Sequence, residues 1–143
     1  MSGATLICAI IGHLVGDYLL QNDWMALNKK KPSPWGNTAC VVHCALWTFA
    51  VILFSEWYRS KNLQWICWAL FLTHYAQDRT NVIAWWMRLR WKDQSKFMEN
   101  DRLFLGSHEC DASIIPGLGP WSVIVVDNVW HIVTIWAIWR YIA

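Results

Sequence analysis

The sequence predicts an all-α integral membrane protein, built as a four-helix bundle, and three observations support this. Of the 143 residues, 56% are hydrophobic and 15% are charged, against about 45–50% and 25% in soluble domains. Four apolar runs approach the length of about 20 residues that crosses a bilayer as a helix. Titratable side chains recur inside these runs at helical spacing. One transmembrane domain over residues 1–143 is expected.

The apolar runs follow one another with polar or helix-breaking segments between them. Pro32 and Pro34 interrupt the chain before the second run, and Pro120 precedes the fourth, where Trp121 marks its interfacial end. Other tryptophans near the ends of runs are expected to form an aromatic belt: Trp35, Trp57, Trp65, Trp85, Trp86 and Trp139. The expected spans are residues 4–20, 38–58, 63–86 and 121–142.

Basic residues predict the orientation of these spans. The connecting segments 21–37 and 87–120 carry eight lysines and arginines, whereas the opposite side carries only Arg59, Lys61 and Arg140. The positive-inside rule places the two basic segments in the cytoplasm and both termini on the other side. We expect a multi-pass protein of the bacterial inner membrane.

Three of the runs contain a histidine and an aspartate four residues apart. The pairs are His13 with Asp17, His74 with Asp78, and Asp127 with His131. Residues at this spacing lie on one helical face. The order of the pair reverses in the fourth run, as antiparallel helices require if all histidines share one depth and all aspartates another. With His43 from the second run, seven ligands are predicted to converge: His13, Asp17, His43, His74, Asp78, Asp127 and His131.

Buried imidazole and carboxylate groups of this number suit two metal ions that share a carboxylate or a water. Zinc is the first expectation, with iron or manganese as alternatives, because nitrogen and oxygen ligands serve all three. A hydrogen-bonded His–Asp network that ties the helices together is one alternative. A relay for protons or cations is another.

Further residues are expected beside these ligands. Gln21 lies one turn beyond Asp17, and Asn128 adjoins Asp127, so both could orient ligands. Arg79 follows Asp78 and could steady a carboxylate or receive an anion; a snorkelling arginine is the alternative. Asp78 or Asp127 could act as the general base. Cys40 and Cys44 flank His43 but are expected to point elsewhere, as buried apolar residues.

The motifs resemble a family of small bacterial and phage integral membrane proteins of unknown function. The resemblance rests on the stretch from His13 to Lys29, on His43, on the segment from His74 to Asp78, and on the closing segment from Ser122 to His131. It covers nearly the whole chain and implies a helical membrane protein. It implies no substrate.

The leading functional hypothesis is a metal-dependent membrane hydrolase that acts on an ester, amide or phosphoester of a lipid or lipid-linked substrate, from the cytoplasmic leaflet. The alternative is a non-enzymatic, metal-stabilised interaction protein, such as a phage factor acting on a host membrane complex. A homo-oligomer or a membrane protein partner is compatible with both. With a net charge of +2 and no long basic stripe, a nucleic-acid partner is not expected.

Overall fold

The computed structural model describes residues 3–80, 82–90 and 121–143. These residues form helices and no strand, which confirms the all-α class. The chain divides into two compact units, residues 1–79 with 131–143 and residues 80–130. Helix α7 (Trp121–Tyr141) contributes its last turns to the first unit and its first turns to the second.

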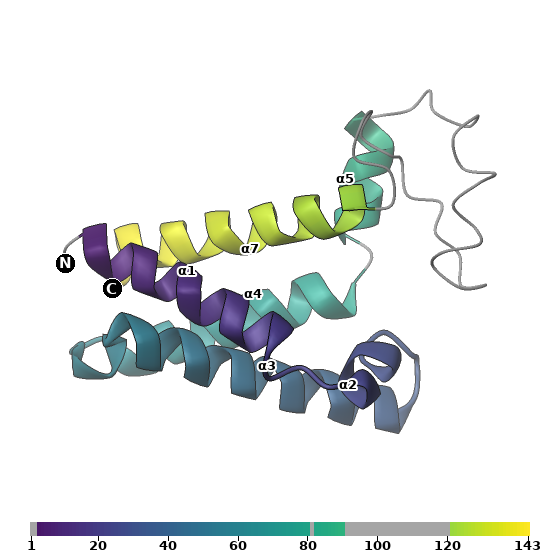
Figure 1. Cartoon of the computed structure of the whole chain (residues 1–143), viewed down its shortest axis with the longest axis horizontal. Coiled ribbons are helices and arrows are strands. Elements are labelled where there is room, and N and C mark those ends of the chain that lie inside the picture. Colours follow the sequence, from purple (N-terminus) through teal and green to yellow (C-terminus); the bar gives the residue numbers. More distant parts are fainter. Residues whose placement is uncertain (1–2, 81, 91–120) are drawn as a thin grey trace. The chain divides into compact units, whose positions relative to one another are not determined.

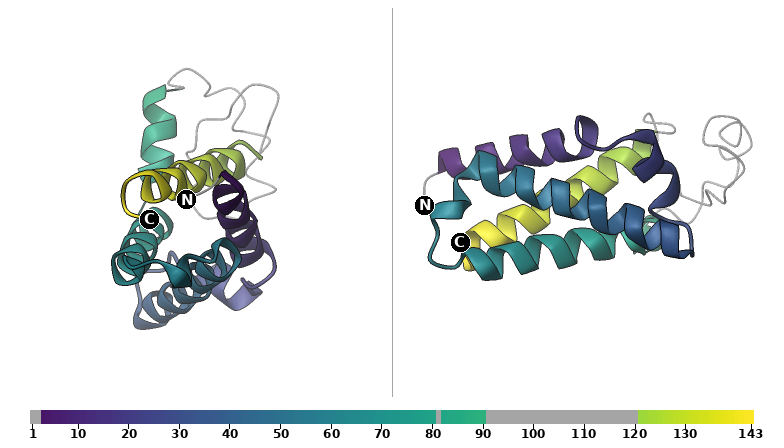
Figure 2. Two further views of the ribbon diagram at one scale, coloured as in Figure 1. Left: turned by 90° about the vertical axis from the view of Figure 1, so that its left-hand side faces the viewer. Right: turned by 90° about the horizontal axis from the view of Figure 1, so that it is seen from below.

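The first unit is organised around α3 (Pro34–Ser55), which packs against both α1 (Gly3–Tyr18) and α4 (Leu63–Arg79). The start of α1 and the end of α7 lie at the same end of this unit, so successive long helices alternate in direction (Figures 1 and 2). The apolar core joins residues from all four long helices, together with Trp57 from the short helix η1 (Trp57–Arg59): Ala9, Trp47, Val51, Ile66, Leu70, Ile135 and Ile138.

Two glycines allow α1 to approach α3 closely. A Cβ atom on Gly12 would lie 2.7 Å from the backbone oxygen of Ala50, and one on Gly16 would lie 2.7 Å from Cδ1 of Trp47. The spacing of these glycines is the small-xxx-small pattern that lets helix backbones meet in membranes. The contact positions His13, between the two glycines, against α3.

A short helix, α2 (Asp23–Asn28), lies in the first basic segment. The Asn22 side chain caps it by accepting a hydrogen bond from the Met25 N–H at 2.9 Å. Ser33 caps α3 in the same way, through the Gly36 N–H, and Pro34 occupies the first helical turn, where its missing N–H costs little. Helix α3 therefore begins earlier than the expected residue 38.

The third apolar run, expected as one segment over residues 63–86, is two helices. Helix α4 ends at Arg79, and α5 (Val82–Arg90) begins after the Thr80–Asn81 step. Asp, Thr and Asn are poor helix formers, which favours a break in this polar segment. In the second unit, Ile83 and Val126 are buried, and the Trp86 ring meets the Trp130 ring edge-on at 5.8 Å. Residues 91–120 of the second basic segment lie outside the described residues.

Among the described residues, two helices are long and apolar enough to cross a membrane, Pro34–Ser55 and Ser122–Tyr141. Helix α1 is apolar but shorter. Of the tryptophans expected in an aromatic belt, Trp35 is 71% exposed and Trp65 is 61% exposed, but Trp57 is fully buried. The assignment of Trp57 to a belt is therefore wrong, because its ring fills the core beneath η1 (Trp57–Arg59).

Candidate metal centre

Histidines from four helices meet inside the first unit. His13, His43, His74 and His131 are each at most 1% exposed. The ring centroids of His43 and His74 are 5.1 Å apart, those of His74 and His131 are 4.4 Å apart, and those of His13 and His131 are 5.4 Å apart. The structure thus gathers imidazoles from segments that are distant in the sequence.

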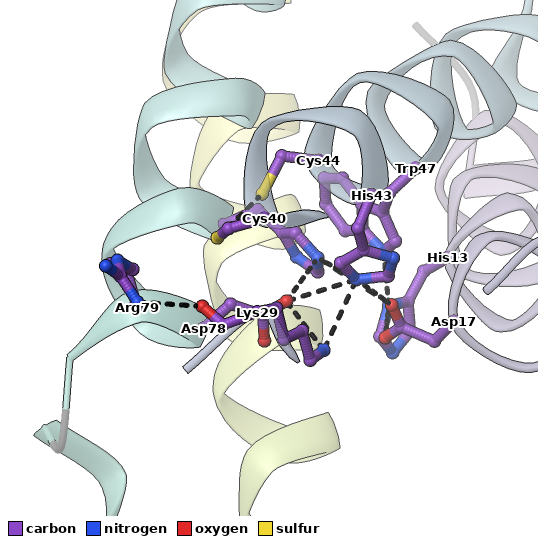
Figure 3. A network of polar contacts seen from close by, with 10 residues as sticks. His13, Asp17, Lys29, Cys40, His43, Cys44, Trp47, Asp78 and Arg79 are labelled. Carbon is purple, nitrogen blue, oxygen red and sulfur yellow. Dashed lines mark hydrogen bonds and ion pairs between the residues drawn. The ribbon is translucent and has the colours of Figure 1, made fainter. Parts of the chain in front are cut away.

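Trp47 fixes two of these rings. Its indole stacks on His74, with ring centroids 3.9 Å apart and planes inclined by 15°. Its Nε1–H donates a hydrogen bond to His13 Nδ1 at 3.0 Å (Figure 3). Asp17 Oδ2 lies 3.1 Å from the same Nδ1. Because an indole N–H only donates, Nδ1 must be unprotonated to accept from Trp47, and it cannot then donate a proton to Asp17 Oδ2.

Four potential ligand atoms face one another across the centre of this network. His43 Nε2 lies 3.1 Å from His74 Nε2, 3.4 Å from Asp17 Oδ1 and 3.1 Å from Asp78 Oδ2. His74 Nε2 lies 3.7 Å from Asp17 Oδ1 and 3.5 Å from Asp78 Oδ2. A tetrahedral ion with bonds of about 2.0–2.1 Å has ligand atoms about 3.3–3.4 Å apart. The two histidine nitrogens therefore lie from each other and from each carboxylate oxygen at about the distances that such an ion requires.

The unsatisfied atoms of the network also point to a missing partner. Asp17 Oδ1 is buried and accepts no hydrogen bond within the described part of the chain. Buried carboxylate oxygens are costly without a donor or a cation. Groups of ligand atoms within 4.8 Å of one another could hold a metal ion here, one of them formed by Asp17, His43 and His74.

In two of the histidines, the second ring nitrogen makes no hydrogen bond to a described residue. His43 Nδ1 and His74 Nδ1 are buried and have no hydrogen-bond partner among the described residues. Metal-bound imidazoles usually donate this N–H to an acceptor. In this chain, packing holds the His74 ring instead, chiefly through the stacked indole of Trp47.

Lys29 enters the same centre and was missed as a site residue. Its ammonium donates a hydrogen bond to Asp78 Oδ2 at 2.7 Å and lies 3.4 Å from His43 Nε2 (Figure 3). In the sequence, Lys29 counted only toward the charge of a cytoplasmic segment. The available signal was its position at the end of the stretch from His13 that carries the family resemblance.

Arg79 contacts backbone and amide oxygens and no carboxylate among the described residues. Its guanidinium donates to the backbone oxygens of Lys29 and Lys31, at 3.1 and 2.7 Å, and to Asn37 Oδ1 at 2.5 Å. Arg79 therefore fastens the segment between α2 and α3 to the end of α4. The expectation that it steadies a carboxylate is corrected, because its terminal nitrogens donate to these neutral oxygens. The readings as an anion receptor or a snorkelling arginine stay predictions.

Cys44 also differs from its expected position. A ligand atom of Cys44 lies within 4.8 Å of ligand atoms of His74 and Asp78, so a thiol is available at the centre. The Sγ atoms of Cys40 and Cys44 are 3.9 Å apart. The prediction that both cysteines point away from the site was wrong for Cys44, since α3 turns its side chain toward α4.

Three predicted residues remain: Gln21, Asn128 and Asp127. Helix α1 ends at Tyr18, so Gln21 lies beyond it and does not continue the face of His13 and Asp17 as expected; the chain leaves the helix there to reach the Asn22 cap of α2. Asn128 donates to the backbone oxygen of Ile124 within α7 at 2.7 Å. Asp127 precedes His131 by one turn on the part of α7 that belongs to the second unit, and its role stays a prediction.

Comparison with known proteins gives a family and no function. The family described as "Protein of unknown function (DUF3307)" matches residues 5–143. Searches of curated proteins and of solved structures give no match to the chain.

Proposed function

The chain belongs to the DUF3307 family of proteins of unknown function, and we propose that it is a membrane-embedded, metal-dependent hydrolase. The observation that carries this proposal is the set of four ligand atoms from His43, His74, Asp17 and Asp78. These atoms come from three helices, and the distances from the two histidine nitrogens to each other and to the two carboxylate oxygens are 3.1–3.7 Å. A buried site with this spacing and two carboxylates suits a divalent ion such as zinc. Iron and manganese accept the same ligands.

The distribution of apolar side chains supports a place in the membrane. The four histidines of the candidate centre and Asp78 are buried inside the first unit, whereas large apolar side chains are exposed on its helices: Ile7, Ile11, Phe49, Leu53, Trp68, Leu72, Val133 and Trp136 are each at least 44% exposed. Contiguous exposed apolar surface is rare on soluble monomers. We place the protein in the bacterial inner membrane, with the segment that contains α2 on the cytoplasmic side.

The bound ion would make hydroxide available near neutral pH and stabilise negative charge that develops on a carbonyl or phosphoryl oxygen. Asp78 or Asp127 would serve as the general base. A site below the cytoplasmic headgroups suits the ester, amide or phosphoester part of a lipid or lipid-linked substrate. The second ion of a dinuclear centre rests on the sequence alone, through the full set of seven ligands.

The first experiment is metal analysis of the protein purified in detergent. We expect at least about one transition-metal ion per chain, and its loss in His43→Ala and His74→Ala, because each variant removes one ligand. The matched control is His108→Ala, which removes the histidine outside the motifs. Wild-type protein with far less than one ion per chain would contradict the proposal at its first step.

A second candidate function is a metal-stabilised interaction protein, which the ion pair between Lys29 and Asp78 favours because it already links the α2 region to α4. Asp78→Asn distinguishes the two candidates. In a hydrolase, the variant keeps its fold and loses hydrolysis of lipid extracts from the producing cells, measured by mass spectrometry. In a structural centre, the variant loses its metal and its assembly together.

A further inference from the structure

Lys29 brings a positive charge into contact with two of the four ligand atoms. Its Nζ is 2.7 Å from Asp78 Oδ2 and 3.4 Å from His43 Nε2. The Lys29 side chain is only 15% exposed and that of Asp78 only 3%. An exposed lysine would gain little from such a pair, but a buried carboxylate needs a partner. The contact belongs to the interior of the proposed site.

The backbone of Lys29 is held independently of its side chain. Arg79 donates to the backbone oxygens of Lys29 and Lys31, on either side of Lys30. Lys29 also caps the end of α2, through its N–H to the Met25 oxygen at 2.9 Å. The flexible four-carbon side chain can therefore leave Asp78 while the segment stays in place.

The positive charge of Lys29 touches an oxygen that a metal ion would need. Asp78 Oδ2 accepts the hydrogen bond from Lys29 and is also one of the four candidate ligand atoms. An ammonium in contact with this oxygen would lie close to a divalent ion bound there, and low polarity makes the repulsion between two cations strong.

We propose that Lys29 is a tethered cation that competes with the metal ion for the Asp78 carboxylate. In the metal-free protein, its ammonium holds Asp78 beside His43, in the position of a ligand. When a divalent ion enters, the ammonium is released from Asp78, so metal affinity is set in part by this lysine. This inference rests on the proposed metal site and adds its regulation.

Metal binding by charge-matched variants tests the competition. The full chain in detergent, stripped of metal, is titrated with Zn²⁺ against a chromophoric chelator. We expect Lys29→Met to bind Zn²⁺ about tenfold or more tightly than wild type, because the competing charge is gone. Lys30→Met removes the same charge from a neighbouring exposed position and should stay within about twofold, as expected of a screened surface charge. Equal effects of the two variants, or weaker binding by Lys29→Met, would overturn the inference.

A measurement on the wild-type chain does not depend on the variants folding. The protein is treated with an amine-acylating reagent with and without Zn²⁺, and the modification of Lys29 and Lys30 is compared by mass spectrometry. Release of the Lys29 ammonium should raise its labelling relative to Lys30 severalfold on addition of Zn²⁺. A ratio that stays constant or falls would refute the competition.

The outcomes separate this inference from the function on which it rests. If wild type binds Zn²⁺ and neither the affinity of Lys29→Met nor the labelling ratio changes as expected, the metal site stands and the competition fails. If neither wild type nor Lys29→Met binds Zn²⁺, the metal site fails and the competition with it.

Discussion

Asp78 shows how much a single residue depends on partners that are remote in sequence. It lies on α4, but its Oδ2 contacts the ammonium of Lys29 and Nε2 of His43 from two other elements. The spacing to His74 predicted one partner, since residues four apart share a helical face. The lysine could not be inferred from spacing, because 49 residues separate it from Asp78.

Asp17 offers a direct test of the ligand set at this scale. We predict that Asp17→Asn lowers Zn²⁺ affinity by more than about tenfold, the loss that even the outer partners of metal ligands cause when removed. Stability of the metal-free protein should also fall, because the carboxylate faces His13 Nδ1 at 3.1 Å and His43 Nε2 at 3.4 Å. Chelator competition and thermal unfolding measure the two effects. The control is Asp23→Asn, an exposed aspartate in α2; equal Zn²⁺ affinity in both variants would count against Asp17 as a ligand.

Trp47 is predicted to orient imidazoles as well as fill the core. Trp47→Phe keeps an aromatic ring near His74 but removes the N–H that pairs with His13 Nδ1. We expect a loss of about 1–3 kcal/mol in the free energy of unfolding, from the broken buried bond and the smaller ring. Trp68→Phe, at a position 60% exposed, is the control. Denaturation of both variants in detergent checks the difference, and equal stability would show that the bond contributes nothing.

At the scale of elements, close contact between α1 and α3 decides where His13 and Asp17 lie. The atoms nearest to a Cβ on Gly12 belong to the backbone of Ala50 and Val51, at 2.7 and 2.8 Å, so no side chain can move aside to make room. The sequence predicted both helices but not this contact. Packing depends on the shapes of two surfaces, whereas hydropathy reports only that each surface is apolar.

Gly12→Ala is predicted to separate α1 from α3. The added methyl group overpacks the interface, at a cost of about 1–3 kcal/mol, and should lower Zn²⁺ affinity because Asp17 moves with α1. Gly3→Ala is a matched control, since a Cβ there meets nothing within 4 Å. Thermal unfolding and metal titration of the two variants give the comparison. Similar values for both would contradict the close packing of α1 and α3.

At the scale of the whole molecule, the basic segments predict which side of the membrane each end occupies. A full-length chain with alkaline phosphatase at its C-terminus should be active in bacteria, and one with green fluorescent protein there should be dark. The reason is that we expect the segment with Lys29, Lys30 and Lys31 to be retained in the cytoplasm. If the green fluorescent protein fusion is fluorescent and the alkaline phosphatase fusion is inactive, the C-terminus lies in the cytoplasm and the assigned orientation is wrong.

The sequence by itself determined the helical class, because apolar runs of this length have few other ways to satisfy their backbone groups. It also singled out His13, His74 and their aspartates, since helical spacing is a local property of the chain. The helical pattern in the sequence predicted two helices that are too long: α1 ends before Gln21, and α4 ends at Arg79.

Only the tertiary structure decided which of these groups meet and what accompanies them. In the folded chain, Lys29 contacts Asp78, and Cys44 lies near His74 and Asp78. The Arg79 guanidinium donates hydrogen bonds to backbone oxygens of the segment between α2 and α3. Each of these contacts joins groups from different helices or segments, so it depends on packing between elements and on the cost of burying an unpaired charge. No periodicity within one segment carries that information.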